Sequence, residues 1–164
     1  MPVDFIRQPD GLGTPLGKYS HVSIARGTEI VTVAGQVGIN DSGQLTGDGS
    51  LAAQTWQAFQ NVATALKSAG LGMRDIFKTT TYLVGAENIP EFMAGRTAAF
   101  REFFEDGQFP PNTLLVVERL VEQRFTIEVE AFAIRELDDP AMPALLFWGR
   151  APRINHDTTI ANGL

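Results

Sequence analysis

Residues 125–133 read Phe-Thr-Ile-Glu-Val-Glu-Ala-Phe-Ala and follow the two-residue period of a β-strand. One face of such a strand carries small and apolar side chains, and the other carries Glu128 and Glu130. We expect the apolar face to cover a helical layer, which leaves the acidic face toward water, a cleft or a partner subunit. Two acids on one strand face need an explanation, so Glu128 is the leading candidate for chemistry.

Composition predicts one domain with a substantial core, because 44% of the 164 residues are hydrophobic. The formal net charge of −6 argues against binding nucleic acid, for which basic patches supply most of the affinity. The chain has no cysteine, which excludes a disulfide, a thiolate nucleophile and a soft metal site. The sequence also contains no phosphate-binding motif and no metal-ligand cluster, and we expect no cofactor.

The N-terminus lacks the basic and long apolar regions of a signal peptide. No apolar run approaches the roughly 20 residues that a membrane span needs. These features predict a cytoplasmic protein with no membrane partner.

The N-terminal part of the chain predicts three strands. Residues 3–7 form the first, and the runs 19–25 and 29–34, which are rich in Val and Ile, form the other two. Only Arg26-Gly27-Thr28 separates these two runs, so we expect them to pair as an antiparallel hairpin.

The rest of the chain alternates helices with strands. Ser50 is a typical N-cap for a helix that runs to about Ala69 and stops at Gly70, and Pro90 opens a second helix that Gly107 ends. Strands are predicted at residues 75–84, 113–118 and 125–135. The order β-β-β-α-β-α-β-β predicts an α+β fold in which two helices cover a mixed sheet. The other face of the sheet needs cover, which favours an oligomer.

Four short strings spread over most of the chain are informative together: Gly17-Lys18-Tyr19-Ser20-His21, Val33-Ala34-Gly35-Gln36-Val37, Ala53-Gln54-Thr55 with Asn61-Val62, and Ile127-Glu128-Val129-Glu130-Ala131. Over residues 15–135 they resemble the RidA family, the reactive intermediate deaminases also called the endoribonuclease L-PSP family. The resemblance implies a chorismate mutase-like fold, a homotrimer and three sites at subunit boundaries. It divides the chain into a RidA-like domain at residues 1–135 and a C-terminal extension or arm at residues 136–164.

The chain departs from the family at the substrate-binding arginine. Family members that hydrolyse imines and enamines hold the substrate carboxylate with this arginine, and matching Arg119-Leu120 to the family's Arg-Leu puts Asn112 at its position. A guanidinium makes a bidentate, charge-assisted pair with a carboxylate, whereas Asn offers one neutral donor group and one acceptor. A loss of about 1.5 to 3 kcal/mol would weaken binding of a 2-imino acid roughly 10- to 100-fold. Thr97 is a second departure, because the family often has a pocket-facing asparagine there.

Other positions still match the family. The resemblance implies that Glu128 positions or activates a water molecule, that Tyr19 hydrogen-bonds substrate or water, and that the backbone N–H of Gly35 lines the pocket. Arg124 is a candidate to restore the missing positive charge from a neighbouring subunit. Arg96 is a weaker candidate, because adjacent helical positions differ by about 100° in direction and it should not point where Thr97 points.

Each candidate also has a purely structural interpretation. Glu128 and Glu130 would then be solvated or ion-paired strand residues, with Glu130 paired to Lys78 or Arg135. Tyr19 would be a half-buried aromatic residue, Asn112 would stabilise a turn after two prolines, and His21 would have a structural role.

We therefore predict a RidA-like small-molecule hydrolase or deaminase with an altered pocket, and not a standard 2-imino-acid deaminase. The alternative is a non-catalytic trimer that binds a small metabolite. An RNA-cleaving protein conflicts with the acidic charge balance and with the lack of paired histidines or lysines. The extension contains an apolar run at residues 144–148, which we expect to pack as an arm on its own subunit or on a neighbour, or to cover the site as a lid.

Overall fold

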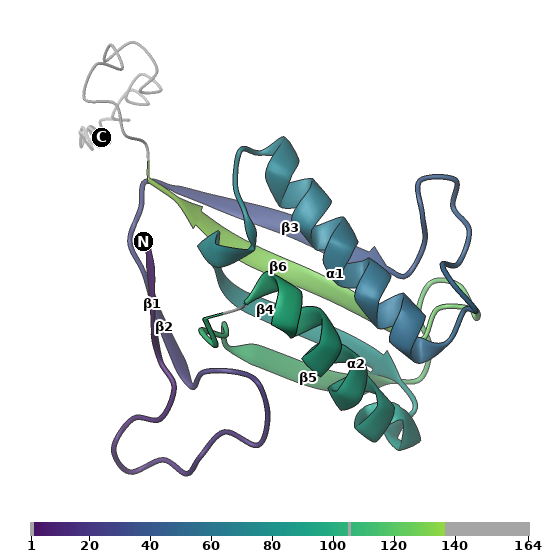
Figure 1. Cartoon of the computed structure of the whole chain (residues 1–164), viewed down its shortest axis with the longest axis horizontal. Helices are drawn as coiled ribbons and strands as arrows, with labels where there is room; N and C mark the ends of the chain where they lie inside the picture. The colour runs from purple at the N-terminus through teal and green to yellow at the C-terminus, as the bar shows by residue number, and fades with distance from the viewer. Residues whose placement is uncertain (1, 105, 137–164) are drawn as a thin grey trace, which may run out of the picture.

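A four-stranded mixed sheet forms the centre of the structure, a computed structural model that describes residues 2–104 and 106–136 (Figure 1). Its order is β3-β6-β4-β5, formed by β3 (Glu29–Val37), β6 (Ile127–Arg135), β4 (Ile76–Val84) and β5 (Asn112–Val117). Strand β6 is antiparallel to both of its neighbours, whereas β4 and β5 are parallel. The α+β class and the predicted order of strands and helices are confirmed.

Two helices, α1 (Leu51–Ser68) and α2 (Ile89–Phe103), lie side by side over one face of this sheet (Figure 1). Two short 3₁₀ helices, η1 (Met73–Asp75) and η2 (Ala86–Asn88), flank β4. Ser50 caps α1 as predicted, because its hydroxyl accepts a hydrogen bond from the N–H of Ala53 at 3.3 Å.

The core lies between the helices and the apolar face of β6. Ile127, Val129, Ala131 and Ala133 are all 0% exposed and pack with the apolar stripes of α1 and α2. Phe59 of α1 meets Phe100 of α2 edge-to-face, with ring centroids 5.1 Å apart. The predicted division of β6 into an apolar face and an acidic face is confirmed.

A separate two-stranded ribbon, β1 (Val3–Ile6) with β2 (Val22–Ala25), lies beside the sheet (Figure 1). The predicted hairpin between residues 19–25 and 29–34 is wrong, because β2 pairs with β1 and β3 pairs with β6. The linker between β2 and β3 also bonds to segments outside this pair of strands. The N–H of Arg26 donates to the carbonyl of Pro2 at 2.7 Å, and the N–H of Thr28 donates to the carbonyl of Arg135 at 2.8 Å. A short linker permits a hairpin but does not exclude partners that are distant in sequence.

The predicted C-terminal arm, including the apolar run at residues 144–148, lies outside the described residues. Within residues 2–104 and 106–136, no helix is both long and apolar enough to cross a bilayer.

Candidate functional site

Glu128 lies near the start of β6, on the sheet face that the helices leave uncovered, which we call the open face. Its partners in the sheet are Tyr82 on β4 and Val37 on β3. A Cβ atom placed on Gly35 would lie only 1.7 Å from Oε1 of Glu128. The carboxylate therefore rests against the backbone of β3, at the point where the β3–β6 register shifts. Any side chain at position 35 would displace it, so the structure brings these two predicted site residues together.

Tyr82 and Lys78 extend the polar surface around Glu128. The hydroxyl of Tyr82 donates to Oε1 of Glu130 at 3.3 Å. The pKa of Tyr82 is raised, chiefly because the side chain is partly buried and also because Glu130 and Glu128 place negative charge beside it. Burial lowers the pKa of Lys78, and Glu130 opposes that effect.

The alternative ion pairs for Glu130 do not form among the described residues. Lys78 instead donates to the hydroxyl of Thr113 at 2.6 Å, and Arg135 pairs with Glu29 at 2.6 Å. Glu130 therefore takes part in the tyrosine contact on the open face.

Asn112 begins β5 and does not form a turn. Its Oδ1 accepts hydrogen bonds from the hydroxyls of Thr79 at 3.0 Å and Thr81 at 2.9 Å. Both threonines are buried on the helix-covered side, beside Val129 and Ala131 of β6. Within one chain, Asn112 and Glu128 therefore project from opposite faces of the sheet, and the amide oxygen of Asn112 is already engaged.

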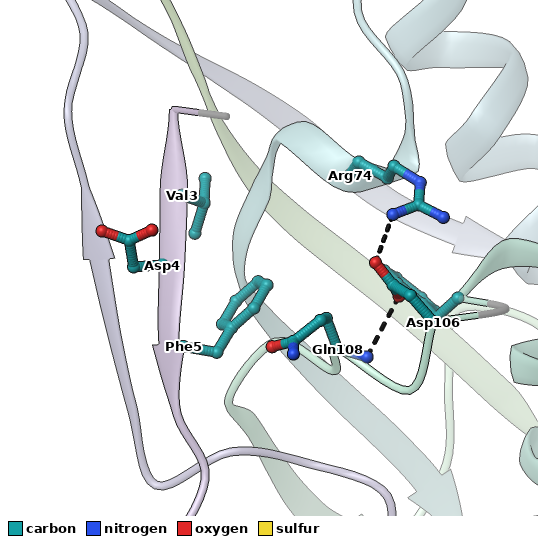
Figure 2. Close-up of a pocket in the computed structure, with 7 residues that line it drawn as sticks. Val3, Asp4, Phe5, Arg74, Asp106 and Gln108 are labelled. Atoms are coloured by element: carbon teal, nitrogen blue, oxygen red, sulfur yellow. Dashed lines mark hydrogen bonds and ion pairs between the residues drawn. The ribbon is translucent and has the colours of Figure 1, made fainter.

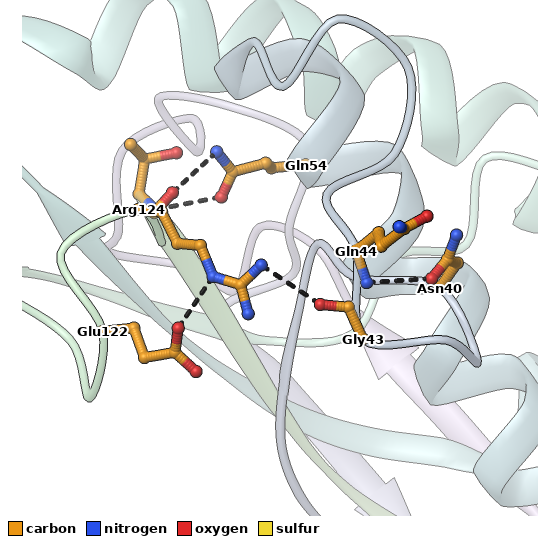
Figure 3. Close-up of polar contacts among 7 residues, drawn as sticks. Asn40, Gly43, Gln44, Gln54, Glu122 and Arg124 are labelled. Atoms are coloured by element: carbon orange, nitrogen blue, oxygen red, sulfur yellow. Dashed lines mark hydrogen bonds and ion pairs between the residues drawn. The ribbon is translucent and has the colours of Figure 1, made fainter.

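Thr97 and Arg124 are both held by local contacts. The hydroxyl of Thr97 donates to the carbonyl of Met93 in the same helix at 2.8 Å. Figure 3 shows that Arg124 donates to Glu122 at 2.7 Å and to the carbonyl of Gly43 at 3.1 Å. These contacts give Arg124 a structural role in joining its loop to the turn that follows β3.

Tyr19 lies in the loop between β1 and β2, above Arg96 of α2. Arg96 is 3% exposed, and a Cβ atom on Gly17 would lie 2.6 Å from its Nη2. The guanidinium carbon is 5.2 Å from the ring centroid of Phe92 and 5.7 Å from that of Phe100. Burial lowers the pKa of Arg96 to about 10, with Tyr19 opposing the shift, so the side chain is charged at neutral pH.

The predicted site residues thus fall into separate groups within one chain. Glu128 and Gly35 lie on the open face, Tyr19 lies in the loop above α2, and Asn112 lies at the start of the edge strand β5. In the described part of the chain, no hydrogen bond joins Tyr19 to Glu128. One chain alone does not assemble the set.

A cavity of about 390 Å³ lies elsewhere, between the β1–β2 ribbon and the segment that follows α2 (Figure 2). Val3 and Phe5 contribute to its apolar wall, and the ion pair between Arg74 and Asp106 contributes to its polar side. None of the predicted site residues lines it. No group of three or more His, Cys, Asp or Glu side chains suited to a metal ion occurs in the described ranges.

Sequence reasoning missed Tyr82 and underrated Arg96. The signal for Tyr82 was the alternation of Lys78, Thr80 and Tyr82 along β4, which puts all three on one face. Arg96 does differ in direction from Thr97, as expected, but it points inward beneath the Tyr19 loop.

Comparison with known proteins agrees with this architecture. The family model described as Endoribonuclease L-PSP matches residues 12–135. A 2-iminobutanoate/2-iminopropanoate deaminase of Escherichia coli K12 is 34% identical over 110 residues, which cover 66% of this chain and 81% of that protein. A RutC family protein of Pyrococcus horikoshii is 29% identical over 122 residues, covering 74% of this chain and 90% of the relative.

Solved structures show the same fold. The crystal structure of YyfB from Yersinia pestis, a Rid family protein described as of unknown function, superimposes with a TM-score of 0.72 at 27% identity, covering 82% of this chain and 100% of that one. The YjgF gene product of E. coli superimposes with a TM-score of 0.59 at 27% identity, covering 81% of this chain and 100% of the other. The chain is therefore a member of the Endoribonuclease L-PSP family, the RidA family that its sequence resembles.

Proposed function

We propose that this protein hydrolyses small imines, enamines or related carbonyl-type compounds. The observation that carries the proposal is the position of the Glu128 side chain, whose carboxylate lies against the backbone of Gly35 on the open face of the sheet. A carboxylate fixed beside an open surface can hold a water molecule and take its proton. The 34% identical deaminase of E. coli supports the same class of chemistry.

The reaction consumes one water molecule. Glu128 accepts a proton from the water molecule while the water oxygen bonds to the imine carbon, and it returns this proton to the nitrogen. The tetrahedral adduct then transfers its hydroxyl proton to the nitrogen and breaks the C–N bond, which releases ammonia or an amine and leaves a carbonyl product. Tyr19 would hydrogen-bond the substrate or the water without ionising. Gly35 leaves the space that lets the carboxylate approach.

The substrate we propose does not depend on a carboxylate held at position 112. Asn112 replaces the family arginine, and its oxygen already accepts hydrogen bonds from Thr79 and Thr81. A neutral amide lacks the bidentate charge of a guanidinium. We therefore propose a pocket that is altered relative to a standard 2-imino-acid deaminase.

A second candidate is a non-catalytic trimer that binds a small metabolite. The hydrogen bonds that occupy the Asn112 oxygen favour this non-catalytic candidate, because a pocket without the family arginine can bind a ligand and yet not turn it over. Saturable metabolite binding with no hydrolysis of any imine would support this candidate over the enzyme.

We also propose that the site forms between subunits of a homotrimer. The separation of Tyr19 from Glu128 within one chain supports this, as does an open face with a 41% exposed Leu115. Random co-assembly of two inactive variants, Tyr19→Phe and Glu128→Gln, in equal amounts would then restore about one third of the sites in mixed trimers, or about one quarter of all sites. Activity that stays at the level of the separate variants would contradict a shared site, and light scattering would give the subunit number.

The direct test of the function is a panel of carboxylated and uncharged imines, assayed with the native chain, Asn112→Arg and Glu128→Ala. We expect the native chain to hydrolyse uncharged as well as carboxylated imines, Asn112→Arg to gain further activity on the carboxylated ones, and Glu128→Ala to lose both. Absence of hydrolysis by the native chain and by Asn112→Arg would contradict the enzyme proposal.

The domain division stays a prediction, with residues 1–135 as the RidA-like domain and residues 136–164 as an arm. Truncation after Arg135 tests it: an unchanged oligomer mass and unchanged stability would leave the arm without a structural role. The cytoplasmic location also stays a prediction.

A further inference from the structure

Three cations gather on one aromatic cluster beside the Tyr19 loop. The guanidinium carbon of Arg7 lies 5.6 Å from the ring centroid of Phe109, and Nζ of Lys18 lies 5.3 Å from the same centroid. Phe109 stacks on Phe100 at 5.5 Å, and the guanidinium carbon of Arg96 lies 5.7 Å from Phe100. A chain with a net charge of −6 thus concentrates positive charge at this place.

None of these three cations has an acidic partner within residues 2–104 and 106–136. The ion pairs found there use other arginines: Arg26, Arg74, Arg124 and Arg135. Nε of Arg96 is buried and has no hydrogen-bond partner. A buried charge without a counter-charge is costly, and contact with two aromatic rings offsets only part of that cost.

The three cations converge on Gly17, next to Lys18 and Tyr19. Arg7 donates to the carbonyl of Gly17 at 3.4 Å, and Nη2 of Arg96 occupies the space where a side chain of Gly17 would lie. Arg7 is exposed and Lys18 is half-buried, so both can contact a ligand, whereas Arg96 is 3% exposed. Water screens the field of a buried charge only weakly. Arg96 therefore attracts an anion near the Tyr19 loop without touching it.

We infer that Arg7, Lys18 and Arg96 form an anion subsite beside Tyr19, which takes the carboxylate of a small organic acid in place of the arginine absent at position 112. The inference rests on the proposed function and deepens it by naming a charged ligand class and the place where its charge is held. Arg7 and Lys18 are the contacting groups, and Arg96 is a positioning residue that supplies charge and supports Gly17.

A matched pair of ligands tests this subsite: 2-oxobutanoate, a carboxylate, and 2-oxobutanamide, its neutral amide. Calorimetry on the full-length native protein should show the acid binding roughly 10-fold more tightly than the amide, since ionised hydrogen bonds are about twice as strong as neutral ones. Arg96→Met keeps a long apolar side chain between the rings and should reduce this preference to within about 2-fold. The double variant Arg7→Gln with Lys18→Met should do the same, and it changes two side chains that are not themselves buried.

Arg101→Gln is the matched control for Arg96→Met, because Arg101 is an exposed cation on the same helix and each substitution removes one positive charge. It should retain the native preference for the acid. Equal binding of acid and amide by the native protein, or binding of neither, would overturn the subsite. An equal loss of preference in Arg101→Gln would also overturn it, because the effect would then be one of bulk charge.

Failure of this subsite and failure of the proposed hydrolysis give different results. Glu128→Gln should lower kcat/KM about 10²- to 10⁴-fold and retain the preference for the acid if both proposals hold. A native protein that prefers the acid but hydrolyses no imine would keep the subsite and reject the enzyme. A native protein that hydrolyses imines but shows no preference for the acid would keep the enzyme proposal and reject the subsite.

Discussion

Strand β6 has two faces with opposite surroundings. On the helix-covered face, Ile127, Val129, Ala131 and Ala133 are completely buried in the core. On the open face, Glu128 rests against Gly35 and Glu130 accepts a hydrogen bond from Tyr82. The same nine-residue strand thus contributes stability through one face and presents carboxylates through the other. Changes on the covered face should alter unfolding, and changes on the open face should alter chemistry.

The largest expected effect is in the core that packs against the covered face, where helix α2 contributes Phe100. Phe100→Ala removes a ring that is 1% exposed and packs against Phe59, Phe104 and Phe109. We expect a loss of about 3–5 kcal/mol in the free energy of unfolding, measured by urea denaturation. Thr80→Ala, on the open face, is the control and should cost no more than about 0.5 kcal/mol. Similar losses for both variants would remove the distinction between the faces.

Gly35→Ala should separate chemistry from stability on the open face. The new methyl group would force the Glu128 carboxylate away from its place, so we expect kcat/KM to fall roughly 100-fold or more. Overpacking should cost about 1–3 kcal/mol in unfolding free energy. Gly13→Ala is the control, because a Cβ atom at Gly13 has open space around it. Native activity in Gly35→Ala would mean that the position of this carboxylate does not matter.

Asn112→Ala should behave as a covered-face change, although position 112 is a candidate for ligand binding. Removal of the amide leaves the hydroxyls of Thr79 and Thr81, both buried, without their shared acceptor. We expect a loss of about 1–3 kcal/mol by urea denaturation. Thr113→Ala, at the exposed next position, should cost less. An unchanged stability in Asn112→Ala would reject the structural role of the amide.

The sequence predicted the elements whose signals are local. Ser50 caps α1, Gly70 follows its end with a φ of +74°, and the alternation in residues 127–133 places those side chains in turn on the two faces of β6. These features depend on neighbours within a few residues, so the sequence carries them directly.

The errors concern contacts between distant segments. The pairing of β2 with β1 rather than β3 depends on which strand lies alongside, and a short linker does not decide that. Likewise, the family resemblance located position 112 but did not reveal that the Asn112 oxygen is taken by two threonines of β4. The burial of Arg96 depends on the fold of the Tyr19 loop over α2, which no local pattern encodes.

The smallest expected effect is a pH dependence on the open face. The pKa of Tyr82 is raised in the folded protein, so the protonated hydroxyl contributes stability that is complete below the unfolded pKa of about 10. That contribution is lost as the pH rises through the higher folded pKa. Tyr82→Phe should therefore have a shallower decline in unfolding free energy above about pH 10 than the native chain. Identical curves would show that the Tyr82–Glu130 contact does not affect ionisation.

The most direct measurement is kcat/KM of Glu128→Gln on an uncharged imine, together with its free energy of unfolding. Our account predicts that kcat/KM falls about 10²- to 10⁴-fold, while stability stays within about 0.5 kcal/mol of the native value. A variant that hydrolyses the imine at the native rate would contradict the assignment of chemistry to the open face of β6.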